Sequence, residues 1–527
     1  MRSTFMGLEA SKRGLFTQQS ALYTTGHNIS NANTQGYTRQ RVNMEATLGY
    51  PGPGLNAPKT PGHIGTGVQA HSVQRMRDEF VDRQFRQETN KLGYWEATTK
   101  AISQMEDIMS EPSEFGLNQA FNDFWKAMED VGTRPKEAAA RQVAISKAEA
   151  LADSFNYIHT QITQVKQNLG NEIDVSITDI NSTLKQIAAI NEQIQAVEPN
   201  GYMPNDLYDA RDVLIDKLNE FIPVSVERVP SGGNALAIAE GSYTVKFNGI
   251  DLVNGRKYAQ LTATSANGTV NGEVDSMPFK SLNVSELGFP PDRTTSAAEF
   301  EHNDFEASKG KILSLIDSYG YSVVNPDGTL QIDPATGEAV TKGYYPEMLG
   351  KLDHLAEQFI TEFNKLHVEL YTLDSGPTKP SVKGEAFFTG TSASDIKVSN
   401  AIISDPSKLA ASKEQNQEGN GQGAFNLANL QFTGINTLDG ATFQTFYTGL
   451  IGKLGVDGKE SERLRFNTET IRLTVENNRS SMNSVSLDEE MTNMITFQQA
   501  YNANARMITV VDECLDKIIN GMGRVGL

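Results

Sequence analysis

One long run of helical periodicity limits what this chain can fold into. Between Lys136 and Val197, apolar residues recur at steps of mostly three, four and seven. They are Ile145, Leu151, Phe155, Ile158, Ile162, Val165, Leu169, Ile173, Ile177, Ile180, Leu184, Ile187, Ile190 and Ile194. An α-helix rises 1.5 Å per residue, so about sixty residues make a rod roughly 90 Å long. Such a rod is unusual in a compact enzyme and is typical of a fibre.

The C-terminal segment, from Val485 to Asn520, carries a heptad seam. Its positions alternate at steps of four and three: Leu487, Met491, Met494, Gln498, Tyr501, Ala505, Ile508, Asp512, Leu515 and Ile519. This spacing keeps one stripe of a helix facing a partner helix. Residues 488–490 are all acidic and stand where a helix start favours negative charge. The pattern predicts a terminal helix that needs a partner.

The N-terminal segment, to about Ser30, is the predicted partner. Its apolar positions, spaced by seven, are Leu8, Leu15, Leu22 and Ile29, and its companion positions are Ser11, Gln19 and Gly26. Residues 1–45 carry five basic and two acidic side chains, whereas residues 485–527 carry three basic and six acidic ones. Matching seams and opposite charge predict that the two ends of the chain pair as a coiled coil. Two unrelated surface helices are the alternative.

Two motifs resemble the end signatures of a known family. HNISNANTQGYTRQ, residues 27–40, is dense in Asn, Gly, Ser and Thr, so it is predicted to end the first helix and turn. It resembles the N-terminal signature of bacterial flagellar axial proteins, which are the rod, hook and hook-associated proteins. LDEEMTNMITFQQAYNANARMITVVDECLDKII resembles the matching C-terminal signature. The residues that carry the resemblance are Asn28, Asn31, Asn33, Gly36, Tyr37, Glu489, Glu490, Gln498 and Tyr501.

A charged segment after the long helix narrows the resemblance. PNDLYDARDVLIDKLNEFIPVSV, residues 204–226, brings Asp206, Asp209, Arg211 and Asp212 close together. These carboxylates are candidates for general acid and base, but a salt-bridged helix start is the favoured interpretation. The Asp-x-Arg-Asp motif resembles the hook-associated protein 1 branch of the axial family and is not shared by rod and hook proteins.

After Pro223 the periodicity changes from helical to alternating. Short strands are predicted at 224–229, 235–239, 243–247 and 257–264, separated by Gly- and Asn-containing turns. A further hairpin is predicted around the turn Asn325–Gly328. Helical spacing returns from Gly310 to Ser318 and from Met348 to Leu370, and again at 443–454 and 464–482.

The expected fold is therefore mainly α with an inserted β domain. Residues 1–45 and 485–527 form a terminal coiled-coil polymerisation domain. Residues 46–222 and 309–484 form a helical, rod-like body with a small hairpin insert at about 319–345. Residues 223–308 form a β-rich domain that is expected to be exposed.

No catalytic, cofactor or metal site is predicted. The seven histidines are scattered, and the net charge of −19 argues against nucleic acid as a partner. No run is apolar enough for a membrane helix. Cys514 is the only cysteine, and it is expected to be a buried structural residue. A hydrolytic or glycan-binding β insert is a remote alternative, because Glu240 and Asp251 have no evident paired partner of the kind that two-carboxylate glycoside hydrolysis needs.

The resemblance implies a structural subunit at the junction between hook and filament. It implies a ring of identical subunits, contacts with the hook protein and a second hook-associated junction protein, and a flagellar export chaperone on the C-terminal region. It also implies an extracellular place in the flagellum, reached through the export apparatus without a cleavable signal. The narrow N-terminal seam is expected to order only on polymerisation. A hook or distal-rod subunit is the alternative.

Overall fold

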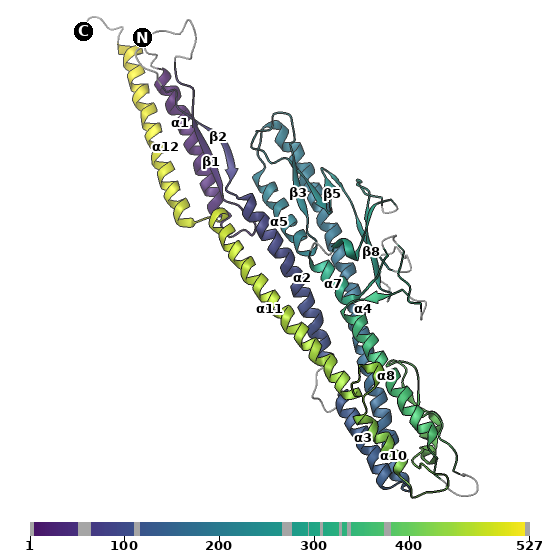
Figure 1. Cartoon of the computed structure of the whole chain (residues 1–527). Coiled ribbons are helices and arrows are strands. Elements are labelled where there is room, and N and C mark those ends of the chain that lie inside the picture. The colour runs from purple at the N-terminus through teal and green to yellow at the C-terminus, as the bar shows by residue number, and fades with distance from the viewer. Residues whose placement is uncertain are drawn as a thin grey trace.

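Long helices run the length of an elongated molecule (Figure 1). The computed structural model describes residues 5–50, 65–109, 116–265, 277–292, 295–305, 309–325, 329–334, 339–373 and 381–521. The two ends of the chain lie together at one tip, and α3 and α10 lie at the opposite tip. The predicted fold class, mainly α with small β sheets, is confirmed.

The terminal unit consists of two helices and a β-hairpin. Helix α1 (Phe5–Ser30) lies along α12 (Leu487–Asp516), which ends in a π-helical turn at Lys517–Gly521. Strands β1 (Gln40–Ala46) and β2 (Val68–Arg75) pair antiparallel and pack against α1. The side chain of Ser486 caps α12 by accepting the Glu489 N–H. The predicted pairing of the two ends is confirmed.

The rod is built around α4, which spans Ala138–Val197 and contains 60 residues, as its periodicity predicts. The helices packed against it are α2 (Glu79–Met109), α3 (Leu117–Thr133), α5 (Asn205–Phe221), α7 (Lys311–Tyr319) and α8 (Tyr344–Glu369). Helix α10 (Gln422–Ala428) packs on α3 and α8, and α11 (Phe443–Asn483) packs mainly on α2. Smaller elements are α6 (His302–Phe305), α9 (Asn400–Ser404), β12 (Phe388–Thr389), β13 (Lys397–Val398) and 3-10 turns at Glu198–Asn200, Pro406–Lys408, Asn429–Phe432 and Asn436–Leu438.

Helix α11 differs from the sequence prediction of two helices. It runs unbroken for 41 residues, through two glycines that separated the predicted segments. A Cβ atom on Gly458 would lie 2.8 Å from Glu106 Oε1 and 3.3 Å from Ile102 Cγ2. This glycine therefore lets α11 approach α2 closely, and the contact along α2 outweighs the weak helix propensity of glycine.

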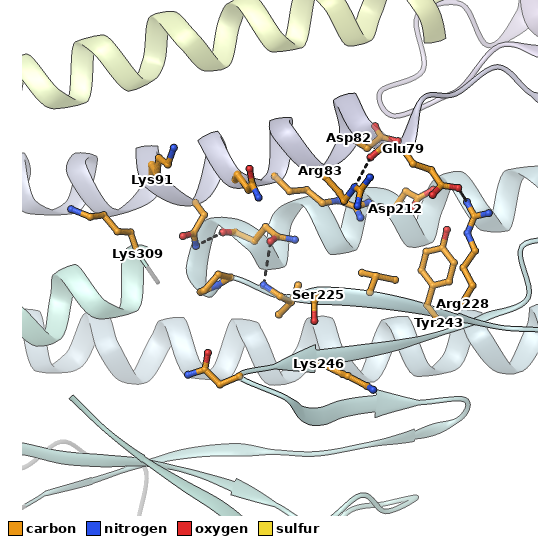
Figure 2. A pocket seen from close by; sticks show the side chains of 18 of the residues that line it. Glu79, Asp82, Arg83, Lys91, Asp212, Ser225, Arg228, Tyr243, Lys246 and Lys309 are labelled. Carbon is orange, nitrogen blue, oxygen red and sulfur yellow. Dashed lines mark hydrogen bonds and ion pairs between the residues drawn. The ribbon is translucent and has the colours of Figure 1, made fainter. Parts of the chain in front are cut away.

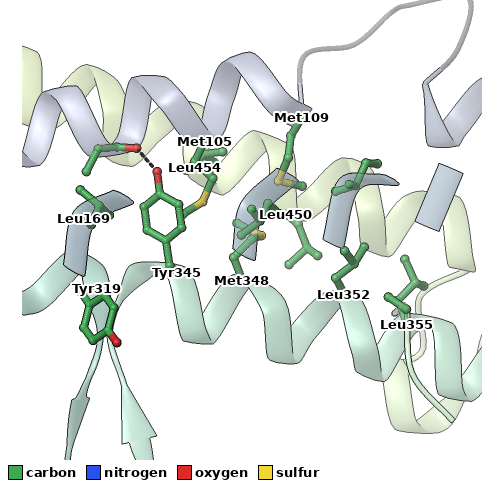
Figure 3. Close-up of a cluster of buried hydrophobic side chains, with 14 of the residues drawn as sticks. Met105, Met109, Leu169, Tyr319, Tyr345, Met348, Leu352, Leu355, Leu450 and Leu454 are labelled. Carbon is green, nitrogen blue, oxygen red and sulfur yellow. Dashed lines mark hydrogen bonds between the residues drawn. The ribbon is translucent and has the colours of Figure 1, made fainter. Parts of the chain in front are cut away.

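The apolar core follows α4 along the rod and extends into the insert, from rings such as Phe121 to Ile187 and Val245. Figure 3 shows side chains of α2, α4, α8 and α11 meeting between these helices, among them Met105, Leu169, Leu352 and Leu450. The hydroxyl of Tyr345 donates to the Ala101 carbonyl at 2.8 Å, so its polar atom is satisfied inside the core. An aromatic cluster continues this core, and its members are Phe121, Phe124, Trp125, Phe155, Phe359, Phe363, Phe387, Phe388 and Phe443.

The inserted strands form two small sheets beside the rod. One has the order β3-β4-β5-β6, with bounds Ser225–Val229, Ser242–Phe247, Ile250–Asn254 and Lys257–Tyr258. The other joins β7 (Leu261–Ser265), β8 (Phe279–Ser285), β9 (Ser296–Glu301), β10 (Tyr321–Ser322) and β11 (Thr341–Lys342). The predicted hairpin thus joins the sheet of the insert, through the parallel pair Tyr321 and Phe279. Residues 326–328 of its predicted turn lie outside the described residues.

One predicted strand, residues 235–239, is wrong. This segment is a pair of turns, because Gly232, Gly233 and Gly241 adopt positive φ. The buried carboxylate of Glu198 accepts the Gly241 N–H at 2.9 Å and a hydrogen bond from the Ser231 hydroxyl. These bonds fold the segment back toward the end of α4 and hold it away from either sheet.

The aromatic cluster yields a stability prediction. Phe359 is fully buried, and its ring centroid lies 5.4 Å from that of Phe121 and 5.0 Å from that of Phe388. We expect Phe359→Ala to lower the free energy of unfolding by about 3–5 kcal/mol, because it removes apolar contacts and leaves a cavity. Phe432→Ala is the control, since that ring is 74% exposed. Urea unfolding followed by tryptophan fluorescence measures both; equal stability of the two variants would contradict the assigned core.

Candidate functional site

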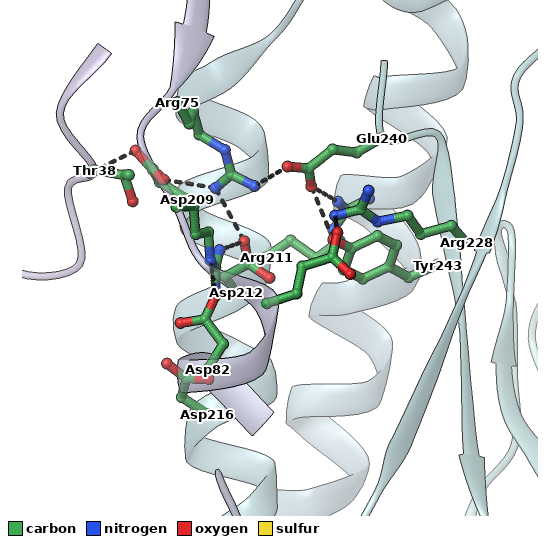
Figure 4. A network of polar contacts seen from close by, with 12 residues as sticks. Thr38, Arg75, Asp82, Asp209, Arg211, Asp212, Asp216, Arg228, Glu240 and Tyr243 are labelled. Atoms are coloured by element: carbon green, nitrogen blue, oxygen red, sulfur yellow. Dashed lines mark hydrogen bonds and ion pairs between the residues drawn. The ribbon is translucent and has the colours of Figure 1, made fainter. Parts of the chain in front are cut away.

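The candidate site is the polar junction where the terminal unit joins the rod. Figure 4 shows residues from the loop after α1, from β2, from α5 and from the insert converging on one network. The three stretches that carried the family resemblance, near residues 28–37, 209–212 and 489–490, meet here. They are brought together although they are far apart in sequence.

Asn28 lies at the end of α1 and is fully hydrogen-bonded. Its Nδ2 donates to Gln40 O at 2.8 Å and to Glu490 Oε2 at 3.1 Å. Its Oδ1 accepts from the Tyr37 hydroxyl at 2.8 Å and from the Gln40 N–H at 3.0 Å. An amide side chain offers two N–H donors and an oxygen that can accept two hydrogen bonds. Neither Asp nor Ser can therefore replace Asn28 without leaving a group unpaired.

Arg39 links the loop after α1 to the start of α12. Its Nε donates to Glu490 Oε1 and its guanidinium NH1 donates to Glu489 Oε2, both at 2.8 Å. The Arg39 backbone N–H donates to Asn483 O at 2.8 Å, at the last residue of α11. The loop therefore holds both sides of the α11–α12 connection.

Below this loop, five arginines face five carboxylates. The arginines are Arg75, Arg77, Arg86, Arg211 and Arg479, and the carboxylates are Asp82, Asp209, Asp212, Asp216 and Glu240. Arg75 donates to Asp209 at 2.7 Å and to Asp212 at 2.9 Å. Buried charges are stabilised only when they are paired and hydrogen-bonded. This cluster meets that requirement with a balanced set.

The Asp-x-Arg-Asp motif supplies part of this cluster and also holds the signature loop. Asp209 Oδ2 accepts the Thr38 N–H at 3.0 Å. The guanidinium carbon of Arg211 lies 3.3 Å from the Tyr243 ring centroid. Gly36 has φ +80°, and a Cβ there would lie 2.1 Å from Val213 Cγ2, so only glycine allows the loop to pass over α5.

The electrostatics favour a structural role for these groups. Burial opposes ionisation of Glu240, but the charge and hydrogen bond of Arg75 and the charge of Arg211 outweigh it and lower the pKa of Glu240 to about 2. Burial, with Asp206, Asp209 and Glu490 nearby, raises the pKa of Tyr37. A carboxylate locked between two guanidinium groups cannot serve as a general acid at neutral pH. The partners of Glu240 are thus the two arginines Arg75 and Arg211, which hold it as a structural anion.

Three comparisons with known proteins place this chain in a family. Residues 102–388 match the family model described as flagellar hook-associated protein FlgK helical domain. Residues 8–38 and 478–521 match the models flagella basal body rod protein and flagellar basal body rod FlgEFG protein C-terminal. Flagellar hook-associated protein 1 of Bacillus subtilis is 42% identical over 99% of this chain and 99% of its own length. The chain belongs to the flagellar hook-associated protein 1 family.

More distant relatives agree. Flagellar hook-associated protein 1 of Escherichia coli is 27% identical over 96% of this chain and 98% of its own length. The solved structure titled flagellar hook junction protein FlgK from Burkholderia pseudomallei covers 77% of this chain and 100% of that chain, with a TM-score of 0.57. At 13% identity it supports the fold alone. As a hook-associated protein 1, this chain is a structural component of the extracellular flagellum, and none of these comparisons indicates a catalytic family.

The structure divides the predicted helix-packing residues of this hook-associated protein into two groups. Leu8, Leu15, Leu22, Ile29, Met494, Tyr501, Ile508 and Leu515 are half-buried, whereas Leu487, Met491 and Ile519 are exposed. Gln498 and Asp512, predicted in the seam, are exposed as well. At every second position of the seam, the half-buried residues are instead Phe497, Asn504 and Val511. Each lies one residue earlier than predicted. Burying Phe and Val costs less desolvation than burying Gln and Asp.

The face of α1 that packs most deeply consists of small and polar residues. Its buried positions are Gly14, Thr17, Ala21, Thr25 and Asn28. A Cβ on Gly14 would lie 2.8 Å from Asn504 Oδ1, so this glycine sets the distance between the two terminal helices. The leucine spacing in the sequence indicates a different face of α1.

Three further predicted residues have clear positions. Asn31 Nδ2 donates to the His27 carbonyl at 3.1 Å and helps end α1. Asn33 is exposed. Cys514 is exposed too, so the expectation of a buried structural cysteine is wrong. The seam passes through Val511 and Leu515, and Cys514 falls beside it.

Sequence reasoning missed the arginines that complete the site. Arg39, Arg75, Arg77 and Arg86 hold acidic signature residues. Arg479, which was missed as well, holds Asp82 and Asp216. The available signal was the motif itself, because adjacent buried carboxylates require cations nearby. Within the described ranges, no group of three or more His, Cys, Asp or Glu side chains is placed to hold a metal ion. No helix in those ranges is both long and apolar enough to span a bilayer.

The amide of Asn28 gives a direct test of the junction. We expect Asn28→Ala to accelerate hydrogen exchange in α1 and α12 about tenfold or more, because it removes a donor from Glu490 and both the donor and the acceptor that Asn28 offers to the Gln40 backbone. Asn33→Ala is the control, since it changes the same residue type in the same signature stretch at an exposed position. Mass-spectrometric exchange on the full chain measures both. Unchanged protection in Asn28→Ala would contradict the role of this amide.

Glu240 makes part of the stability dependent on pH. Its folded pKa of about 2 lies below the ordinary value of 4.5, so its stabilisation is fully present above about pH 4.5 and is lost as pH falls toward 2. We expect the stability difference between wild type and Glu240→Gln to shrink over that window by at most about 1.4 kcal/mol per pH unit. Urea unfolding at a series of pH values measures it. Glu227→Gln, at an exposed ion pair with Lys246, is the control; a difference for Glu240→Gln that is constant with pH would refute the assignment.

Proposed function

We propose that this protein forms the junction between hook and filament by polymerising through its paired terminal helices. The observation that carries this proposal is the apolar surface left on the terminal pair. Its exposed large residues are Phe5, Phe16, Tyr23, Leu487, Met491, Ile495, Met507, Val510, Ile518 and Ile519. Exposed apolar surface on this scale marks an interaction site. Copies of the same helix pair, arranged as a ring, would bury it.

The packing between α1 and α12 supports assembly-coupled ordering. The deepest face of α1 is built from Gly, Thr, Ala and Asn, so it buries little apolar area. A helix pair with so little burial is marginal alone and gains most of its stability from neighbouring subunits. Termini that order late would cross a narrow export channel as extended chain and would not assemble early.

The same surface is the proposed contact for the other partners. Neighbouring copies, the hook protein and a second hook-associated junction protein would share the exposed faces of α1 and α12. Before export, the amphipathic segment 485–520 would be covered by a flagellar chaperone, in the manner of an amphipathic helix lying in a groove. The proposal also includes export of the protein through the flagellar apparatus without a cleavable signal.

The rival within the axial family is a hook or distal-rod subunit. The hook-associated protein 1 family membership and the Asp-x-Arg-Asp motif favour the junction. The remote alternative, a flagellum-associated glycan-binding or hydrolytic protein, is disfavoured because Glu240 is held by Arg75 and Arg211.

Electron microscopy of a strain lacking the protein, complemented with variants, tests the proposal. We expect hooks without filaments in the deletion strain, filaments restored by the wild type, and no restoration by the double variant Met491→Glu and Ile495→Glu. These side chains are 50% and 57% exposed, so the variant should fold normally. Gln499→Glu, at an exposed position of the same helix, is the control and should restore filaments.

Two outcomes would overturn parts of this proposal. Missing hooks in the deletion strain would favour the rod or hook rival. Full restoration by the double variant would rule out these α12 side chains as the polymerisation surface, while leaving the junction role in place.

A further inference from the structure

A groove of about 930 Å³ lies between α2 and the sheet of the insert (Figure 2). One wall is the stretch of α2 from Glu79 to Trp95 together with Arg77, which precedes the helix. The opposite wall is the edge strand β3 with the β4–β5 turn. Helix α5 contributes Asp212 and Asn219 to the lining. A trough between a helix and a sheet edge is the shape that binds an extended peptide as an added strand. The polar junction and the terminal surface described above do not account for this groove.

Strand β3 turns an unused edge toward the groove. Within the described sheet it pairs with β4 alone. The Val224 N–H points away from β4 and donates to Asn219 Oδ1 at 3.2 Å. In an antiparallel pair, backbone groups two residues apart point to the same side. The N–H and C=O groups of Val226 and Arg228 are therefore directed into the groove, where these residues form part of the lining.

The groove is rich in cations although the whole chain carries a net charge of −19. Seven lining residues are basic and three are acidic: Arg77, Arg83, Arg86, Lys91, Arg228, Lys246 and Lys309, against Glu79, Asp82 and Asp212. Arg77 and Arg86 are committed to the polar junction. Arg83 donates to the Glu79 carbonyl, and Lys309 Nζ lies 4.3 Å from the Trp95 ring centroid. Neither has a carboxylate partner among the contacts of the described residues.

Cationic side chains lie at the two ends of the groove. Two of them are in ion pairs: Lys91 with Glu88 at 2.7 Å, and Arg228 with Glu79 at 2.5 Å. Figure 2 places Lys91 and Lys309 together at one end and Arg83 and Arg228 toward the other. Arg83 and Lys91 are eight residues apart on α2, which is about 12 Å along the helix. An extended strand covers that distance in about four residues, and residues four apart lie on one face of a strand. Two carboxylates at positions i and i+4 would therefore reach both ends.

We propose that this groove binds an extended, acidic peptide segment of a partner protein, which adds to β3 as a further strand. Backbone hydrogen bonds to Val226 and Arg228 would supply the strand pairing. Carboxylates at i and i+4 would contact Arg83 at one end and the lysine pair at the other. Because α2 forms the facing wall, the trough admits one chain and excludes edge-to-edge pairing of whole sheets, the usual hazard of a free edge.

Binding of defined peptides to the full chain tests this proposal. The probes are eleven-residue peptides of Thr and Val that carry two Glu residues at spacings from two to six, with Gln versions of each. We expect the i, i+4 peptide to bind at least about tenfold more tightly than its Gln version and than the i, i+3 peptide. Fluorescence polarisation with labelled peptides gives the affinities.

Variants of the protein separate the contribution of charge to peptide affinity from the contribution of backbone strand pairing. The double variant Arg83→Glu and Lys91→Glu should lose at least about tenfold in affinity, and Lys185→Glu, at an exposed position of α4, should lose none. Val226→Pro removes one edge N–H without changing charge and should also abolish binding, because proline is tolerated on a sheet edge but cannot donate. Circular dichroism and the melting temperature check that each variant folds.

Three outcomes would overturn the proposal. The first is that no peptide binds. The second is peptide binding that depends on charge alone and is unaffected by the Glu spacing or by Val226→Pro. The third is that the peptides do not bind but an oligogalacturonate probe does, through Arg83 and Lys91. The last result would assign the groove to an acidic glycan. None of these outcomes bears on the junction role, which the complementation experiment tests separately.

Discussion

The placement of the terminal helices depends on one buried amide and the ion cluster beneath it. Asn28 joins the end of α1 to Glu490 on α12 and to the backbone of β1. Two covalent connections, β2 to α2 and α11 to α12, link the terminal unit to the rod. Such short connections leave rotation free unless side chains fix it. The four hydrogen bonds of Asn28 and the arginine–carboxylate pairs provide that restraint.

The aromatic cluster and the polar junction lie toward opposite ends of the rod. Near the far tip, Phe359 on α8 is fully buried against rings of α3, α4 and α11. Toward the terminal unit, α11 contacts α2 through small or polar residues such as Ser461 and Thr468. The rod therefore has its own core and does not depend on the terminal pair for stability. In the proposed assembly, the terminal pair can remain marginal because other subunits would bury its large apolar side chains.

The sequence predicts periodic features of this fold well and long-range polar partners poorly. The 60-residue helix and the pairing of the two ends followed from apolar spacing, which is a local property. Alternate positions of the α12 seam, at Phe497, Asn504 and Val511, were misplaced by one residue, because the two possible heptad patterns share Met494, Tyr501, Ile508 and Leu515. The partners of Asp212 could not be found, since Arg75, Arg77 and Arg86 are more than a hundred residues away and carry no spacing signal. The strand predicted at residues 235–239 was wrong because hydrogen bonding to the buried Glu198 carboxylate outweighs the alternating pattern of the segment.

The polar character of the junction fits a subunit that must assemble in one geometry. An apolar contact of similar size would tolerate several registers and would also adhere to other copies before assembly. A buried ion cluster is stable only when every charge meets its partner, so a slip of α12 along α1 would strand Glu490 away from Asn28 and Arg39. The cost of that unpaired charge selects a single register. The exposed apolar residues of α12 are then presented at fixed positions, as the proposed ring of subunits would require.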